Sequence, residues 1–111
     1  MKISYKGINE KVVTFLADGN IKCGDLVKVS SNNTVSVCVN GDIFDGIAVS
    51  SAGGLCSVQV AGCAEVKANA ALSTGYMALA ADSEGVTAND AGRMCTVVNY
   101  DSNEGLATII F

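Results

Sequence analysis

Hydrophobic residues along this chain fall in short runs that glycines and polar residues separate. The clearest stretch covers residues 41–62, GDIFDGIAVSSAGGLCSVQVAG, where apolar runs at 47–49 and 55–60 lie between glycines. Short runs that are rich in valine and isoleucine and bounded by glycine predict β-strands joined by tight turns. The stretch contains no nucleophile–base pair, metal cluster or phosphate loop, so it indicates a structural role rather than a catalytic or binding site.

The same pattern predicts strands along the rest of the chain, with turn signals about every 8–12 residues, which is typical of a sandwich or barrel. A hairpin is expected around Ala61-Gly62, and the alanine-rich residues 65–79 predict a loop or a short turn of helix. Asp45-Gly46 predicts a turn or a bulge. We therefore expect an all-β, single-domain β-barrel or β-sandwich over residues 1–111. The further predicted strands are 12–17, 26–29, 34–39, 64–66, 77–80, 94–100 and 106–111.

A weak internal repeat accompanies these strands. An offset of 51 residues lays residues 24–60 on residues 75–111 without a gap, and the matches fall on glycines and strand positions. A duplicated β-unit would need conserved residue types at those positions, although chance similarity between β-sequences is the alternative. The identical pairs are Gly24/Gly75, Val35/Val86, Gly41/Gly92, Ser51/Ser102, Gly54/Gly105 and Leu55/Leu106.

Strand alternation also predicts where the cysteines lie. Cys56 shares a face with Val58 and Val60 and is expected in the core, whereas Cys63 shares parity with charged residues and is expected to face outward. Cys38 is expected on the face opposite the valines of 34–39. The chain has five cysteines, no C-x-x-C and no secretion signal, which favours reduced structural thiols over disulfides, a redox centre or a zinc site. These cysteines are Cys23, Cys38, Cys56, Cys63 and Cys95.

Composition and charge limit the kinds of core and of binding partner that we expect for this chain. Half of the residues are hydrophobic but there is no Trp, with three Phe and three Tyr, so the core should consist mainly of small aliphatic side chains. The net charge is −4, the bases are scattered and the only arginine is Arg93. Nucleic acids and anionic membranes both require clustered bases, so neither is an expected partner.

The N-terminal region shows neither a signal peptide nor a membrane anchor. Its lysines are not followed by an apolar run, and no stretch of the chain approaches the roughly 20 apolar residues of a membrane span. We expect a protein that is made and kept in a cytoplasm unless it leaves inside an assembly. Residues 1–10 are short and polar and predict a flexible N-terminal arm.

Candidate catalytic groups are few. Histidine is absent, which excludes histidine-based triads and the commonest general base. The D-x-N-x-G fragment at 101–105 lacks the later acid of a calcium loop, and Asp, Asn, Ser and Gly together are typical of hairpin turns. We therefore predict no catalytic, cofactor or metal site and no enzymatic activity. The carboxylate pairs that remain are Asp42/Asp45, Asp82/Glu84 and Asp101/Glu104.

The order of the motifs from residue 21 to residue 111 resembles the small capsid decoration proteins of tailed bacteriophages, also called capsid cement or head-stabilising proteins. The chain departs from that pattern at Cys23-Gly24, where such proteins commonly have Pro-Gly. The resemblance covers about four-fifths of the chain. The motifs, in chain order, are CGDLVKV, NNTVSVCV, DIFDGIAV, GLCSVQVAG, ALSTGYMAL, EGVT as a turn at 84–87, and the terminal strand LATIIF.

The resemblance implies a β-barrel or β-sandwich on the outer surface of an expanded capsid, as a virion protein made in the bacterial cytoplasm. Its partner would be the major capsid protein, and it would self-associate, with a trimer favoured. Its work would be to bridge capsid subunits against the pressure of the packaged DNA, with the N-terminal arm ordering on the capsid. The resemblance assigns no interface residues and no cofactor.

A ligand- or carbohydrate-binding β-module of a phage appendage is the alternative. Sugar sites usually use aromatic platforms, and this chain has few rings to offer. Those rings are Tyr5, Tyr76, Tyr100, Phe15, Phe44 and Phe111.

Overall fold

The computed structural model describes residues 10–68, 72–82 and 85–111, and within these ranges every regular element is a β-strand. The all-β prediction is therefore confirmed. Residues 1–9, most of the predicted arm, lie outside the described residues. The strands are β1 (Lys11–Ala17), β2 (Leu26–Ser31), β3 (Thr34–Val37), β4 (Gly46–Ala52), β5 (Leu55–Ala61), β6 (Cys63–Lys67), β7 (Gly75–Asp82), β8 (Gly85–Ala88), β9 (Arg93–Asp101) and β10 (Leu106–Ile110).

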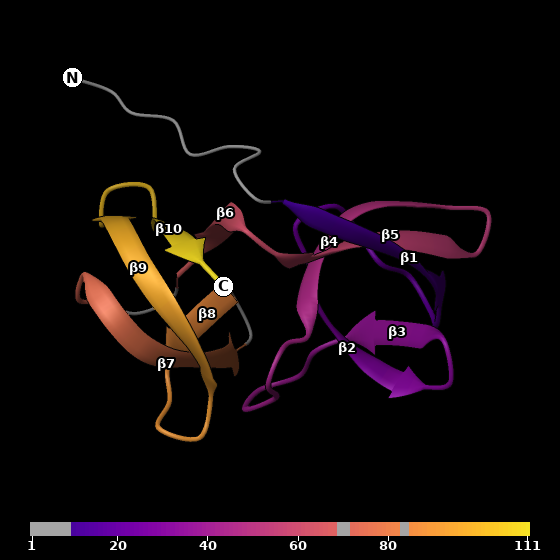
Figure 1. Ribbon diagram of the computed structural model, residues 1–111, viewed down its shortest axis with the longest axis horizontal. Coiled ribbons are helices and arrows are strands. Elements are labelled where there is room, and N and C mark those ends of the chain that lie inside the picture. The colour runs from indigo at the N-terminus through magenta and orange to yellow at the C-terminus, as the bar shows by residue number, and fades with distance from the viewer. Residues whose placement is uncertain (1–9, 69–71, 83–84) are drawn as a thin grey trace.

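The strands form two units that lie side by side (Figure 1). The first unit is a closed barrel with the strand order β1-β3-β2-β4-β5. The second unit is a five-stranded sheet with the order β6-β10-β9-β7-β8. A parallel bridge between Ala68 and Val86 brings the two edges of this second sheet together. Both units therefore have the same cyclic order of strands.

Strand register shows that the units repeat each other at the offset seen in the sequence. In the first unit Leu16 lies opposite Leu55, and in the second Lys67 lies opposite Leu106. Each of these residues is displaced by 51 positions from its counterpart. The parallel contact of Ala17 with Val35 recurs, at the same offset, as the Ala68–Val86 bridge. The repeat is therefore present in the structure. It also includes β1, which lies outside the residues 24–60 that the sequence offset aligns.

The repeat is not gapless, because the turn between β9 and β10 is two residues longer than its counterpart. The first unit joins Ala52 to Leu55 through the two-residue turn Gly53-Gly54, whereas Asp101 lies opposite Leu106 in the second. Both turn glycines have positive φ, 60° and 79°, which a tight right-twisted hairpin requires. The sequence match of residues 51 and 102 is therefore not a structural equivalence.

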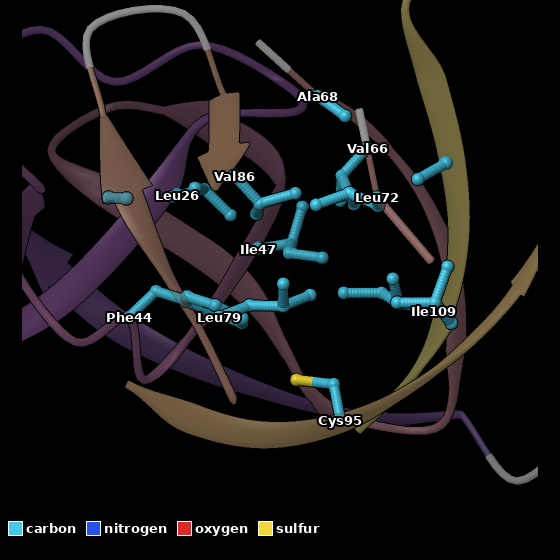
Figure 2. Close-up of a cluster of buried hydrophobic side chains, with 13 residues drawn as sticks. Leu26, Phe44, Ile47, Val66, Ala68, Leu72, Leu79, Val86, Cys95 and Ile109 are labelled. Carbon is cyan, nitrogen blue, oxygen red and sulfur yellow. The ribbon is translucent and has the colours of Figure 1, made fainter. Parts of the chain in front are cut away.

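The two units share hydrophobic core. The first unit has a small core of its own, which contains Val27, Val35 and Val58. The core of the second unit is larger because side chains of the first unit enter it, as Figure 2 shows around Leu79. The contributions from the first unit are Leu26 of β2, Phe44 of the β3–β4 connection and Ile47 of β4.

Arg93 at the start of β9 joins the units through polar contacts. Its guanidinium donates to the carbonyl oxygens of Asp45 at 2.9 Å and Val60 at 3.0 Å, both in the first unit. The same group lies 5.8 Å from the ring centroid of Phe44 and 5.2 Å from that of Phe111, within cation–π range. The only arginine of the chain therefore binds backbone carbonyls of the first unit and lies against one aromatic ring from each unit.

The predicted hairpin around Gly62 is wrong. β5 ends at Ala61 and pairs with β1 and β4, whereas β6 begins at Cys63 and pairs with β10 in the other sheet. Gly62 crosses between the units and exchanges two backbone hydrogen bonds with Phe111, at 3.0 and 2.9 Å.

The outward orientation predicted for Cys63 is wrong for the same reason. Cys63 is 6% exposed, because this end of β6 lies at the junction of the units, and its carbonyl accepts a hydrogen bond from the buried Gln59 side chain. Alternation cannot reveal burial when a second unit covers the outer face of a strand. The prediction for Cys56 is confirmed, since its side chain is fully buried beside Val58.

The structure corrects several further predictions. Residues 65–79 contain no helix in their described part, which consists largely of the end of β6 and the start of β7. The turn expected at 84–87 contains the start of β8, and at Asp45-Gly46 the chain bends at Asp45 and β4 begins at Gly46. The strand expected at 34–39 ends at Val37, and only Val35 of its valines is buried, whereas Cys38 packs against the shared core.

Candidate interaction surface

The candidate carboxylates serve local backbone structure. Asp101 Oδ1 accepts hydrogen bonds from the amides of Asn103 at 2.9 Å and Glu104 at 3.4 Å, as expected of a hairpin turn. Asp45 Oδ2 accepts from the Val29 amide at 2.8 Å. Asp82 is the last residue of β7, and its predicted partner Glu84 lies outside the described residues.

Asp42 belongs to a partly exposed ion pair. Its Oδ2 accepts a hydrogen bond from Lys28 Nζ at 2.7 Å and another from the Val39 amide at 2.9 Å. The Lys28 hydrogen bond, followed by that of Val39, holds the pKa of Asp42 below its usual value, and the same pair raises the pKa of Lys28. Asp42 thereby closes the turn before Phe44.

The cysteines do not converge. In the described part of the chain no group of three or more Cys, Asp or Glu side chains is placed to hold a metal ion, and all five thiols are free. Cys56, Cys63 and Cys95 are buried, and burial raises the pKa of each. Burial, followed by the charge of Asp42, raises the pKa of Cys38 to about 11, which leaves Cys23 as the exposed thiol.

We expect one thiol to react rapidly with a disulfide reagent in the native protein at pH 8. That thiol is Cys23, because the thiolate is the reactive form and the other cysteines are covered or have raised pKa values. Titration with an aromatic disulfide reagent should give one fast equivalent per chain, and all five in denaturant. A fast equivalent that survived in Cys23→Ser would contradict this assignment.

Most aromatic rings are occupied by packing. Phe44 is fully buried, and Phe15, Tyr100 and Phe111 pack against the two cores. Phe44 and Phe111 meet edge to face, with ring centroids 6.2 Å apart. Among the described residues Tyr76 alone presents an open ring, with 73% of the residue exposed. The described rings therefore do not assemble a stacking platform.

A groove of about 1210 Å³ runs between the units. Its lining includes apolar residues such as Leu26 and Val66 and five charged residues, which are Asp25, Glu65, Lys67, Asp82 and Glu104. Glu65, Lys67 and Glu104 are exposed, and Asp25 and Asp82 are half-buried, so none of these five charged residues is fully buried. The groove marks the junction of the two units, and its charged lining residues all remain in contact with solvent.

Exposed apolar side chains form a first patch on the outside of the barrel. Leu16 of β1 lies directly opposite Leu55 of β5, and both are about half exposed. Val12 lies on the same face of β1, four residues before Leu16. We call Val12, Leu16 and Leu55 the β1–β5 patch.

A second patch lies on the outside of the second unit. Thr96 of β9 lies between Tyr76 of β7 and Ile110 of β10, because both are its register partners. Met94 is two residues from Thr96 and therefore on the same face. Tyr76, Met94 and Ile110 are all exposed, and we call them the β7–β9–β10 patch.

Sequence reasoning identified neither patch. Strand alternation can place Leu16 on one face of β1 and Leu55 on one face of β5, but it does not show that these two strands are neighbours.

The described residues contain no helix of the length and hydropathy needed to cross a membrane. Comparison of the chain with protein-family models, curated proteins and solved structures yields no match.

Proposed function

We propose that this chain is a structural virion protein that binds the outer surface of an expanded phage capsid and stabilises the head. The observation that carries the proposal is the pair of apolar patches on the outside of a strand-only scaffold. A decoration protein needs one surface for its own copies and another for the capsid, and exposed apolar patches are typical of such interfaces. The order of motifs that resembles decoration proteins supports the same function.

The shared core also suits mechanical work. A clamp under load must keep its contact surfaces in a constant relative position. Leu26, Phe44 and Ile47 enter the core of the second unit, and Arg93 binds backbone carbonyls of the first. The two patches are thereby held on one body, with the major capsid protein and further copies of the chain, in a trimer, as the proposed partners.

The carbohydrate-binding alternative has less support. It needs exposed rings, and the described rings other than Tyr76 are engaged in packing. Reproducible binding on a glycan array would nevertheless favour it over the capsid proposal.

The test uses expanded capsids, lacking this protein, from the phage or prophage that encodes it. We expect the purified chain to sediment with these capsids at micromolar concentration and to raise the temperature at which they release DNA. Absence of binding under these conditions would overturn the proposal.

Paired variants locate the contact. Tyr76→Ser combined with Met94→Ser should weaken capsid binding or trimer formation at least about tenfold, the scale of a modest interface hot spot. Val39→Ser is the matched control, since Val39 is exposed but belongs to neither patch. Equal binding by the patch variant and the control would exclude the β7–β9–β10 patch, and sedimentation velocity of each free variant separates loss of self-association from loss of capsid contact.

A further inference from the structure

A row of three residues on the outer face of the first unit is buried against the second unit. Leu26 lies opposite Ile47, which lies opposite Gln59, so the row crosses β2, β4 and β5. Each member is next in sequence to a core residue of the first unit, so strand alternation places the row on the outside of the barrel. All three are nevertheless buried, and Leu26 and Ile47 belong to the core of the second unit (Figure 2).

The second unit has the same row, and there it is exposed. Tyr76 lies opposite Thr96, which lies opposite Ile110. Ile110 is displaced by 51 positions from Gln59, and in both sheets the row lies one pair beyond a register shift. This row is therefore the structural counterpart of the buried row. It forms most of the β7–β9–β10 patch, in which Tyr76 is 73% and Ile110 44% exposed.

The surface that receives the buried row has its own counterpart, in the first unit. Ala64 and Ala81 of the second unit pack in the core that Leu26 and Ile47 enter. Their counterparts in the first unit are two valines of β1 and β2. The register pairs that establish this equivalence are Val13 with Val58 and Ala64 with Ile109, and Val29 with Val35 and Ala81 with Val86.

Val13 and Val29 are an uncovered part of the barrel interior. Val13 lies on the same face of β1 as Phe15, which packs against the first core, and Val29 lies directly opposite the buried Val35. Both valines are nevertheless exposed, by 45% and 48%. The first unit thus exposes apolar side chains where the second unit is covered. We call Val13 and Val29 the barrel mouth.

We propose that the β7–β9–β10 patch of one copy packs against the barrel mouth of a second copy, repeating between chains the contact that the units make within the chain. That contact joins two different faces, so each chain keeps one free face of each kind, and both free faces are apolar. Such a head-to-tail contact closes into a ring or continues as a filament. A closed ring of three copies agrees with the trimer of the proposed function.

The contact is not copied in every residue. At the offset that relates Ile47 to Thr96, the counterpart of Phe44 is Arg93, which already binds the first unit of its own chain. The contact between copies therefore rests on the three residues of the β7–β9–β10 patch. Leu16 and Leu55 lie on the other face of the barrel wall and stay free for the capsid. The inference does not depend on the capsid proposal, because it concerns the free chain.

Sedimentation velocity of the free chain over a range of concentrations tests the contact. Tyr76→Lys and Val13→Lys each bring a charge against apolar side chains, so each should weaken self-association at least about tenfold. Both side chains are exposed in the single chain, so the fold should be kept, and circular dichroism checks this. Tyr76→Ser and Val13→Ser repeat the test if a lysine variant unfolds. Val39→Lys is the matched control, because Val39 is exposed and belongs to neither surface.

Mixing the two variants tests the head-to-tail geometry. The Tyr76→Lys chain keeps an intact barrel mouth and the Val13→Lys chain keeps an intact patch. Each should be monomeric alone, whereas an equimolar mixture should form a dimer with one chain of each kind. A mixture that stays monomeric, or a Val13→Lys chain that self-associates like the control, would overturn the proposal.

The capsid assay separates this inference from the proposed function. A wild-type chain that stays monomeric up to about 1 mM, where weak contacts are populated, and whose capsid binding is lost in Tyr76→Lys, would assign the patch to the capsid and overturn the inference. A chain that self-associates as described but binds no capsid would overturn the proposed function alone.

Discussion

Replacing Phe44 with alanine should lower the free energy of unfolding by about 3–5 kcal/mol, the usual cost of truncating a buried aromatic residue. Phe44 is fully buried although it lies in a connection between strands, and its ring belongs to the core of the other unit. The truncation removes the edge-to-face contact with Phe111 and the cation–π contact with Arg93 as well as buried area. Urea unfolding followed by circular dichroism measures the change.

Ile43→Ala is the control for Phe44→Ala. Ile43 precedes Phe44 directly and is half exposed, so its truncation should change the free energy of unfolding by no more than about 0.5 kcal/mol. A loss as large as that of Phe44→Ala would show that the connection, rather than the buried ring, carries the stability. A Phe44→Ala chain that unfolds in two separate transitions would identify this ring as the main source of cooperativity between the units.

Gly46→Ala is expected to destabilise the barrel by about 2–3 kcal/mol, within the range for overpacking. Gly46 begins β4 and is buried, and a Cβ atom there would lie 2.6 Å from the carbonyl oxygen of Gln59 and would overlap a methyl group of Val58. The Gln59 carbonyl is backbone of the paired strand β5, so relief requires the two strands to separate. The midpoint of urea unfolding should fall accordingly.

Gly53→Ala separates overlap from backbone strain. A Cβ atom at Gly53 would meet no atom within 4 Å, but its φ of +60° is unfavourable for a residue with a side chain. This variant should therefore lose only about 1–2 kcal/mol, the cost of a left-handed conformation. A Gly46→Ala variant that is no less stable than Gly53→Ala would contradict the close approach of β4 and β5.

Local pattern predicted much of the fold. Period-two alternation and glycine spacing indicated nine of the strand positions, because pleat geometry and turn conformations act within a few residues. β8 was missed because it has only four residues, and the Gly-Val-Thr sequence with which it begins resembles a turn. The burial of Cys56 was predicted correctly because Cys56 packs in the core of its own unit, where strand alternation is enough to tell the inner face from the outer face.

The candidate surface could not be predicted in the same way. The β7–β9–β10 patch requires three strands in a particular order and register, and residues 76, 94 and 110 show no sequence pattern that links them. Arg93 likewise appeared as one scattered base. Only its position opposite the carbonyls of Asp45 and Val60 shows that it joins the units.

The sequence by itself determined that the chain is all-β and approximately where its strands and turns lie, and it suggested a unit that recurs at an offset of 51 residues. The strands and turns follow from local geometry, which a linear pattern records, whereas the strand register established that the repeat is structural. The tertiary structure alone decided that β6 leaves β5 for the second sheet, that Cys63 is buried and that Phe44 completes the other unit's core. These outcomes depend on which surfaces two units bury against each other, and burial between residues far apart in the chain leaves no periodic signal.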